Sequence, residues 1–271
     1  MIIDFHTHQF PDAIAEKTIA MLAGRSGLTP ATDGTARGLS EKLKADGIDL
    51  GIVLPVVTRP GQFDTVNACA ARLHGEYPRL LSFGGIHPED EDIPGHVKRI
   101  AEMGLRGIKI HPDYQGVMID DERYVRIARE ALSRGLILIT HAGVDDGVGG
   151  KTHCPPERAA KFLDAVYGGK EPDEAKIVFA HGGGNRMFDG VLTHLAGRNV
   201  YFDLSYICSY IDKETAVKLI RAHGAERILF GSDCPWGSPG GTLRFIRDLP
   251  LTGEEKDAIL GGNAERLLGI K

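Results

Sequence analysis

The chain has 271 residues, of which 42% are hydrophobic and 25% are charged, an ordinary balance for a globular protein. Its formal net charge of −5 argues against nucleic acid or an anionic membrane as a partner. No apolar run approaches the roughly 18 residues that a membrane-spanning helix needs, and the N-terminus lacks the basic and apolar segments of a signal peptide. We therefore expect a cytoplasmic protein that acts on a small molecule, with a homodimer as the commonest assembly.

Short apolar or β-branched runs alternate with longer stretches of helical periodicity along the chain. The predicted strands are residues 2–5, 51–54, 80–86, 105–110, 136–140, 176–180, 200–204 and 227–230. The predicted helices between them are residues 12–22, 62–74, 94–103, 121–133, 156–165, 186–195 and 212–222, and two more, 242–247 and 254–268, follow the last strand. Residues 24–38 and 142–156 are predicted loops, and the second is long, polar and Gly-rich, like loops that cover active sites.

This alternation predicts an α/β fold, a single (β/α)8 or TIM barrel that occupies residues 1–271 as one domain. Most of the strands lack polar alternation, as expected when both faces of a parallel sheet are buried. A barrel of this kind needs about 250 residues, which is nearly the whole chain. A doubly wound open sheet is the alternative.

Polar residues gather where the predicted strands end. Six histidines and two aspartates occupy such positions: His6, His8, His87, His111, His141, His181, Asp203 and Asp233. In a TIM barrel the catalytic groups come from the C-terminal ends of several strands, where the loops form a mouth. Histidines scattered over a surface would show no such preference, so this distribution predicts an active site.

Four of these residues form the predicted metal site. His6 and His8 are two positions apart, so on a strand both imidazoles face one side. Asp4 shares that side one step deeper, where it is expected to orient a histidine. His141 and Asp233 add a third imidazole and a carboxylate, giving three histidines and one aspartate with room for water. The prediction is one divalent cation, zinc in the first place, with manganese, iron or cobalt as alternatives. A network of hydrogen-bonded histidines without a metal is the competing interpretation.

The remaining inward polar groups are predicted to act on the substrate. His181 is expected to be an acid/base group, with a role as ligand of a second metal as the alternative. Lys109 has the same strand parity as His111, and a buried lysine needs a partner, for which Asp203 is the candidate. Substrate contacts are expected from Lys109 and His111, from His87, and from two loop residues, Arg59 and Trp236. His153 reaches the site only if its loop folds over the mouth.

Several motifs resemble those of the amidohydrolase superfamily, in particular its amidohydrolase-2 branch. They are Ile-Asp-Phe-His-Thr-His, Gly-Ile-Lys-Ile-His-Pro, Thr-His-Ala-Gly, Ala-His-Gly-Gly, Gly-Ser-Asp-Cys-Pro-Trp and Gly-Gly-Asn-Ala-Glu-Arg-Leu-Leu, in this order along nearly the whole chain. The resemblance implies a (β/α)8 fold with one metal on His6, His8, His141 and Asp233, and with His181 beside the substrate. In some related barrels a lysine on this strand is carboxylated and bridges two metals, which is an alternative for Lys109.

The resemblance leaves two reactions open. Hydrolysis of a small ester, lactone or amide is the leading expectation, with Asp233 as the base for a metal-activated water and His181 as the orienting group. Non-oxidative decarboxylation of a small carboxylic acid is the alternative, with a proton delivered by His181 or Asp233. The chain looks shorter than the decarboxylases of the branch, which favours hydrolysis. A non-catalytic metal-binding barrel is a third hypothesis and predicts a closed coordination shell.

Overall fold

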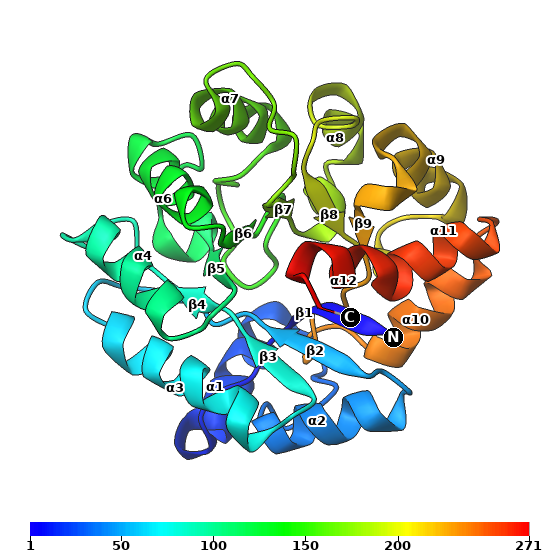
Figure 1. Cartoon of the computed structure of the whole chain (residues 1–271). Helices are drawn as coiled ribbons and strands as arrows, with labels where there is room; N and C mark the ends of the chain where they lie inside the picture. Colours follow the sequence, from blue (N-terminus) through cyan, green and yellow to red (C-terminus); the bar gives the residue numbers. More distant parts are fainter. Residues whose placement is uncertain (271) are drawn as a thin grey trace.

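Parallel strands surround the centre of the molecule and helices surround the strands (Figure 1). The structure is a computed structural model that describes residues 1–270. Its strands are β1 Ile3–Thr7, β2 Leu50–Val53, β3 Leu80–Ser82, β4 Gly84–Gly85, β5 Gly107–Ile110, β6 Ile137–Thr140, β7 Ile177–Phe179, β8 Tyr201–Asp203 and β9 Ile228–Leu229. They pair in the order β1-β2-β3 and β4-β5-β6-β7-β8-β9, and every pair is parallel.

The strands close into the predicted barrel. β3 and β4 form one barrel strand that is interrupted at Phe83, whose amide donates to the Val53 carbonyl at 2.9 Å. The first and last strands meet at a seam. There the amide of Phe5 donates to the Phe230 carbonyl at 2.8 Å, and the amide of Asp233 donates to the His6 carbonyl at 2.8 Å. The eight-stranded (β/α)8 barrel is therefore confirmed and the open sheet is excluded. The seam also places residue 233 beside residue 6.

Helices cover the outside of the barrel. They are α1 Asp12–Ser26, α2 Ala36–Ala45, α3 Phe63–Glu76, α4 Ile93–Glu102, α5 Pro112–Gln115, α6 Glu122–Ser133, α7 Pro156–Tyr167, α8 Phe188–His194, α9 Lys213–His223, α10 Pro239–Asp248, α11 Gly253–Asp257 and α12 Asn263–Leu268. The predicted helix 254–268 is instead α11 and α12 joined by a π-helical segment, Ala258–Gly262. Among the described residues no helix combines the length and apolar character required to cross a bilayer.

Helix α2 was not among the predicted elements, although its sequence carries the signals of a helix. Ala36, Leu39 and Leu43 recur at spacings of three and four residues and are buried against the barrel. The side chain of Thr35 accepts a hydrogen bond from the Gly38 amide at 2.9 Å and caps the first turn. The predicted loop, residues 24–38, overlapped the first turn of α2, and the rest of the helix was assigned to no element.

The apolar core has two layers, and this division positions the active site. One layer fills the barrel interior with residues such as Phe5, Ile52 and Ile139, and the other lies between strands and helices. Ala264 and Leu267 of α12 belong to the interior layer, so α12 covers one end of the barrel, as its red ribbon shows (Figure 1). The chain thereby seals the end where the strands begin and leaves polar groups at the opposite end.

Candidate active site

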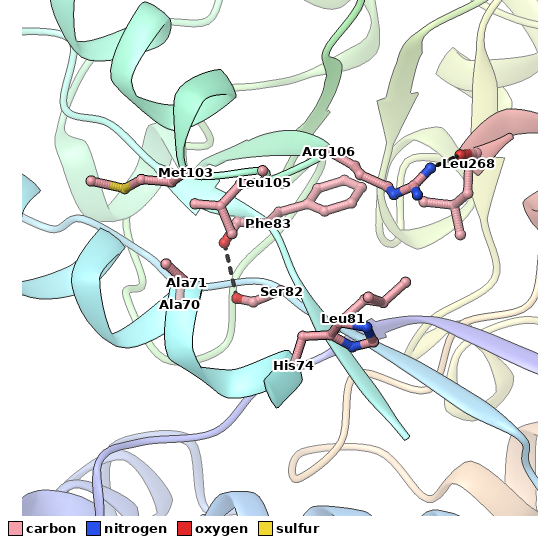
Figure 2. A pocket seen from close by; sticks show the side chains of 11 residues that line it. Ala70, Ala71, His74, Leu81, Ser82, Phe83, Met103, Leu105, Arg106 and Leu268 are labelled. Atoms are coloured by element: carbon pink, nitrogen blue, oxygen red, sulfur yellow. Dashed lines mark hydrogen bonds between the residues drawn. The ribbon is translucent and has the colours of Figure 1, made fainter. Parts of the chain in front are cut away.

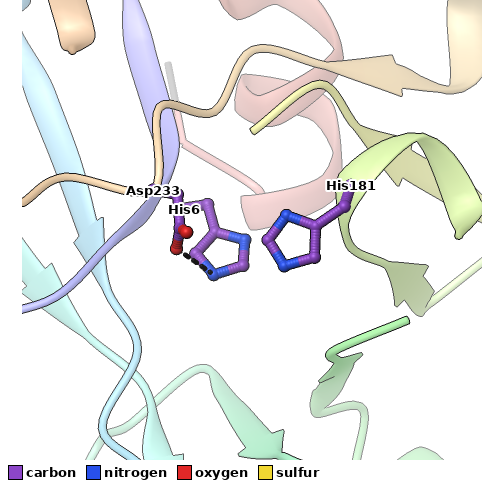
Figure 3. A group of neighbouring side chains, drawn as sticks. All are labelled: His6, His181 and Asp233. Carbon is purple, nitrogen blue, oxygen red and sulfur yellow. Dashed lines mark ion pairs between the residues drawn. The ribbon is translucent and has the colours of Figure 1, made fainter. Parts of the chain in front are cut away.

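Three of the four predicted metal ligands meet at the end of the barrel where the strands finish. His6 Nε2 lies 3.2 Å from His8 Nε2, and both nitrogen atoms approach Asp233 Oδ1, at 3.3 Å and 3.1 Å. Ligand atoms around a tetrahedral zinc with bonds near 2.1 Å are separated by about 3.4 Å, close to these distances. His181 completes a group with His6 and Asp233 whose ligand atoms all lie within 4.8 Å of one another (Figure 3).

The hydrogen bonds of His6 and His8 direct the lone pairs of the two rings at one another. His6 Nδ1 donates to Asp203 Oδ2 at 2.9 Å, and His8 Nδ1 donates to the Leu54 carbonyl at 2.8 Å. In the neutral form of each ring the lone pair is therefore on Nε2. Two lone pairs and a carboxylate oxygen at these distances repel unless a positive charge lies between them. The donor set and its spacing therefore fit a divalent cation.

At this end of the barrel two residues have a backbone conformation that residues other than glycine seldom adopt. Asp233 has φ +65° and His181 has φ +58°, both in the left-handed region. Each costs on the order of 1–3 kcal/mol and persists only where the surroundings impose it, which is common at functional sites. Burial raises the pKa of Asp233, but contact with His8 and the nearness of His6 and His181 outweigh it, so the net shift is downward. Asp233 is thus held as a carboxylate.

Lys109 projects from β5 into the same centre, as its strand parity predicts. Its side chain is 1% exposed and Nζ lies 3.3 Å from His6 Nε2. Burial lowers the pKa of Lys109 to about 8, although the charges of Asp203, Asp233 and Asp145 oppose this. Within the described residues Lys109 forms no ion pair with Asp203, so the predicted pairing is wrong. The lysine instead places a titratable positive charge against the histidine cluster.

The two oxygen atoms of Asp203 are occupied by other groups. Oδ2 accepts from His6, and Oδ1 accepts from the amides of His181 and Ser205, each at 3.0 Å, and from the Ser205 hydroxyl. Asp203 therefore takes the orienting role that the sequence assigned to Asp4. The pairing of β1 with β2 is irregular between Asp4 and Thr7, and Asp4 Oδ1 accepts the amide of His6 and not an imidazole.

The fourth predicted ligand is His141, and the ring of His181 lies between it and the triad of His6, His8 and Asp233. Its Nδ1 is 3.0 Å from His181 Nε2, and His181 Nδ1 faces the Ser205 carbonyl at 3.1 Å. Burial lowers the pKa of His141 well below the ordinary value, so this ring is neutral. Its assignment as a ligand of the same cation stays a prediction.

A second polar group, which the sequence did not reveal as a unit, flanks His141. The His111 ring stacks on it with centroids 4.3 Å apart, and His111 Nε2 lies 3.4 Å from Asp145 Oδ2. Asp113 contributes another carboxylate and accepts both the amide and Nδ1 of His153, each at 3.1 Å. The 142–156 loop therefore folds over the mouth, as its length and composition suggested. Asp113, two residues after His111, and Asp145, in this loop, are the sequence features of this group that the prediction did not include.

Three predicted substrate contacts have no recorded side-chain bond to these clusters within the described residues, and they stay predictions. Arg59 is exposed in the loop before α3, where its amide donates to Gln62. His87 is buried, but its Nδ1 accepts the amide of Glu89 and so stabilises a local turn. Trp236 is half-buried, and the contact that the structure records for it is backbone donation to the Asp233 carbonyl.

A pocket at the other side of the barrel is unsuitable for the same chemistry. It lies beside β3 and before the start of β5, and its lining includes His74, Ser82, Phe83, Arg106 and Leu268 (Figure 2). Arg106 is already engaged there, since its guanidinium donates to the Leu268 carbonyl at 2.6 Å. TIM-barrel active sites lie at the opposite end, where the histidines meet.

The chain is similar in sequence and in fold to known decarboxylases. The chain is 27% identical over 274 residues to the 2-amino-3-carboxymuconate-6-semialdehyde decarboxylase of Dictyostelium discoideum, covering 85% of this chain and 75% of that protein. The 5-carboxyvanillate decarboxylase of Sphingomonas paucimobilis aligns over 100% of this chain and 99% of its own, with a TM-score of 0.67 and 18% identity. The 5-carboxyvanillate decarboxylase of Novosphingobium aromaticivorans, determined with bound manganese, aligns over 100% and 97% with a TM-score of 0.69 and 16% identity.

The family itself is shown by a match that spans almost the whole chain. The family model described as amidohydrolase matches residues 3–270. That range includes His6 and His8, the histidines that follow β6 and β7, and the aspartate after β9, all at the C-terminal end of the barrel strands. The chain belongs to the amidohydrolase family, in its amidohydrolase-2 group.

Proposed function

We propose that the protein is a metal-dependent, non-oxidative decarboxylase of a small aromatic or unsaturated carboxylic acid. The observation that carries the proposal is the meeting of His6, His8 and Asp233 beside His181, in a chain whose curated relative is a decarboxylase. Hydrolysis, the leading expectation from the sequence, uses the same residues. The relative favours the alternative, decarboxylation.

The cation is proposed to be held by His6, His8 and Asp233, with zinc or manganese as the metal. Two imidazoles and one carboxylate suit either ion. A bound cation would act as a Lewis acid that orients the substrate and stabilises negative charge on its oxygen atoms. Asp203 and the Leu54 carbonyl then fix the two rings, because each accepts the hydrogen on Nδ1.

We propose His181 as the proton donor to carbon. Its Nδ1 donates to the Ser205 carbonyl, and its Nε2 lies 3.0 Å from His141 Nδ1, in the ring that is grouped with His6 and Asp233. Protonated His181 would deliver the Nε2 proton to the carbon that bears the carboxylate. The bond between that carbon and the carboxylate then breaks, its electron pair stays on the substrate carbon skeleton, and carbon dioxide leaves. The lowered pKa of Asp233 suits a ligand better than a proton donor.

Lys109 is proposed to attract the substrate carboxylate. Its Nζ is buried beside His6 Nε2, so an anion at the metal would lie within reach of its charge. Lys109 therefore would position an acid and would contribute little to binding of a neutral ester.

Isotope release tests the reaction. The zinc- or manganese-loaded protein would be incubated with carboxylates labelled with ¹³C, including 5-carboxyvanillate, in D₂O. Decarboxylation predicts ¹³C-labelled carbon dioxide and one deuterium at the carbon that carried the carboxylate. A parallel set of esters, lactones and amides in ¹⁸O-labelled water tests hydrolysis.

Two variants connect the result to the site. H8A is expected to lose metal and turnover together, whereas H181N is expected to keep metal and lose turnover at least about 100-fold. The control D212N changes an exposed helix cap and should leave both unchanged. Incorporation of ¹⁸O into products without carbon dioxide release would overturn decarboxylation and favour hydrolysis.

A further inference from the structure

One carboxylate joins three loops at the mouth of the barrel. Asp146 lies in the 142–156 loop after β6, and its Oδ1 accepts a hydrogen bond from the guanidinium of Arg186, in the loop after β7. Its Oδ2 accepts the hydroxyls of Tyr206 at 2.8 Å and Tyr210 at 3.0 Å, both in the segment after β8. The two hydroxyls are 3.0 Å apart, and the guanidinium lies over the Tyr210 ring, 4.1 Å from its centroid. The three loops are therefore tied together at a single side chain.

Other contacts fix the two ends of the 142–156 loop. At the first end the Val144 amide donates to the Asn185 carbonyl at 3.1 Å, and the Asn185 side-chain amide donates to the Val144 carbonyl at 2.8 Å. At the second end the Ile119 amide donates to the His153 carbonyl at 3.0 Å. Between these anchors lies the tip of the loop, residues 145–152. Movement of the tip therefore does not require the ends of the loop to leave the barrel.

The tip borders the candidate active site. Asp145, the first residue of the tip, has its Oδ2 3.4 Å from His111 Nε2. Residues 147–149 and Asp113 line an open cavity of about 500 Å³. Asp113 also reaches the histidine cluster, because its Oδ2 lies 3.8 Å from His141 Nε2. A movement of the tip would therefore change the width of the mouth above the cluster.

Tyr206 connects the three tied loops to the residue proposed as proton donor. Its ring lies beside that of His181, with centroids 6.4 Å apart and ring planes at 75°. Tyr206 at φ +64° and Arg186 at φ +60° also share the left-handed backbone of His181 and Asp233. Such conformations persist only where the surroundings impose them, and they gather at ligand clamps and switch regions as well as at active sites. The backbone strain therefore extends from the reacting groups to the residues that hold the tip.

We propose that Asp146 is a positioning residue, a latch that holds the tip closed over the mouth and keeps the Tyr206 ring beside His181. The inference rests on the proposed function, because the mouth that it closes is that of the decarboxylase site. A hydrogen bond between a guanidinium and a carboxylate is roughly twice as strong as one between neutral groups, which favours the closed tip. The side chains of Asp146 and Arg186 are 20% and 36% exposed, so water can replace these bonds when the tip opens. A loop that admits substrate and releases product needs both properties.

Limited trypsin digestion measures opening of the tip without an assay of activity. Lys151 is exposed in the tip, and Lys170, exposed after α7, is a second cleavage site in the same chain. Cleavage of a loop that opens transiently follows the population of its open form. D146A removes the acceptor of all three donors and is expected to speed cleavage after Lys151 at least about tenfold. Y206F and Y210F, which each remove one hydroxyl, are expected to speed it about threefold, and cleavage after Lys170 should stay unchanged in all three variants.

A matched variant controls for the loss of an ion pair between aspartate and arginine. D164A breaks the 2.8 Å contact of Asp164 with Arg198, which does not involve the tip, and should leave both cleavage rates unchanged. Mass spectrometry of the fragments assigns each cut. Unchanged cleavage after Lys151 in D146A, Y206F and Y210F would overturn the latch, whichever reaction the protein catalyses. Equal acceleration after Lys151 and Lys170 would also overturn it, because the whole chain would then be unfolding.

Steady-state kinetics connects the latch to the proposed reaction. The substrate would be 5-carboxyvanillate or another carboxylate from which the metal-loaded wild type releases carbon dioxide. D146A is expected to raise KM at least about fivefold and to leave kcat within about twofold, because substrate must then draw the tip closed from a more open population. A fall in kcat with unchanged KM would show general damage to the site and would overturn the positioning role. If no carboxylate were turned over while D146A still exposed Lys151, the proposed function would fail and the latch would stand.

Discussion

Replacing Asp203 by asparagine should separate metal affinity from the shape of the site. The carboxylate accepts His6 Nδ1 on one oxygen, and two amides and a hydroxyl on the other. Asparagine has the same size but only one acceptor oxygen. If that oxygen serves the three donors, the amide NH₂ faces His6, which must then move its hydrogen to Nε2 and lose the lone pair that binds metal. If the oxygen serves His6, the NH₂ faces three donors.

The expected loss follows from what such partners contribute. Removing a group that orients a metal-bound histidine costs about 10- to 100-fold in metal affinity, or about 1.4–2.7 kcal/mol. The bond to His6 is 2.9 Å and both side chains are at most 1% exposed, so solvent cannot replace it. We therefore expect D203N to lie at the upper end of that range.

Competition with a metal-binding dye measures the dissociation constant directly. D212N is the matched control, because Asp212 is an exposed N-cap of α9 and asparagine caps helices equally well. Urea unfolding of metal-free protein would report the other orientation, in which D203N loses stability. A D203N protein with unchanged metal affinity and unchanged stability would refute the role assigned to Asp203.

Other parts of the fold give three further predictions. Burial lowers the pKa of His223 to about 4, so the unfolded chain takes up a proton near pH 6.5 while the folded chain does not. Stability falls as the pH falls between these values, and urea titrations should show the wild type losing about 2 kcal/mol more than H223N from pH 7 to pH 5. G143A places a Cβ 2.1 Å from a backbone nitrogen at φ +84°, and it should lower the unfolding free energy by at least about 2 kcal/mol. Its control G149A, at φ +68° in open space, should lower the unfolding free energy by about 1 kcal/mol, and melting measures both. Y124F removes a buried 2.8 Å hydrogen bond to Gln115 and should cost about 1 kcal/mol of unfolding free energy, and no change would contradict that role.

The sequence was sufficient to predict the barrel and the core of the site. Strand–helix alternation gave the eight barrel strands, and barrel geometry placed the histidines that follow β1, β6 and β7 at one end. The meeting of His6, His8 and Asp233 follows from the seam, which pairs the first strand with the last. These features depend on the regular pattern of the fold, which periodicity reports.

The unpredicted parts depend on local departures and on tertiary contacts. An irregular register in β1 directs Asp4 to backbone amides, and Asp203, nearly two hundred residues away, takes its place at His6. Asp145 reaches the site because its loop turns on the Gly147 and Val148 amides. Neither position follows from spacing along the chain, since each is set by the path of a neighbouring segment.

The seam of the barrel has a mechanical consequence. The His6 carbonyl and the Asp233 amide join the first strand to the last, and the imidazole of one approaches the carboxylate of the other. A cation on both side chains would act as a clasp across this junction, tying residues 227 positions apart in sequence. Chelation would then loosen the closed cylinder where its two edges meet, so a chelator should lower the melting temperature as well as turnover.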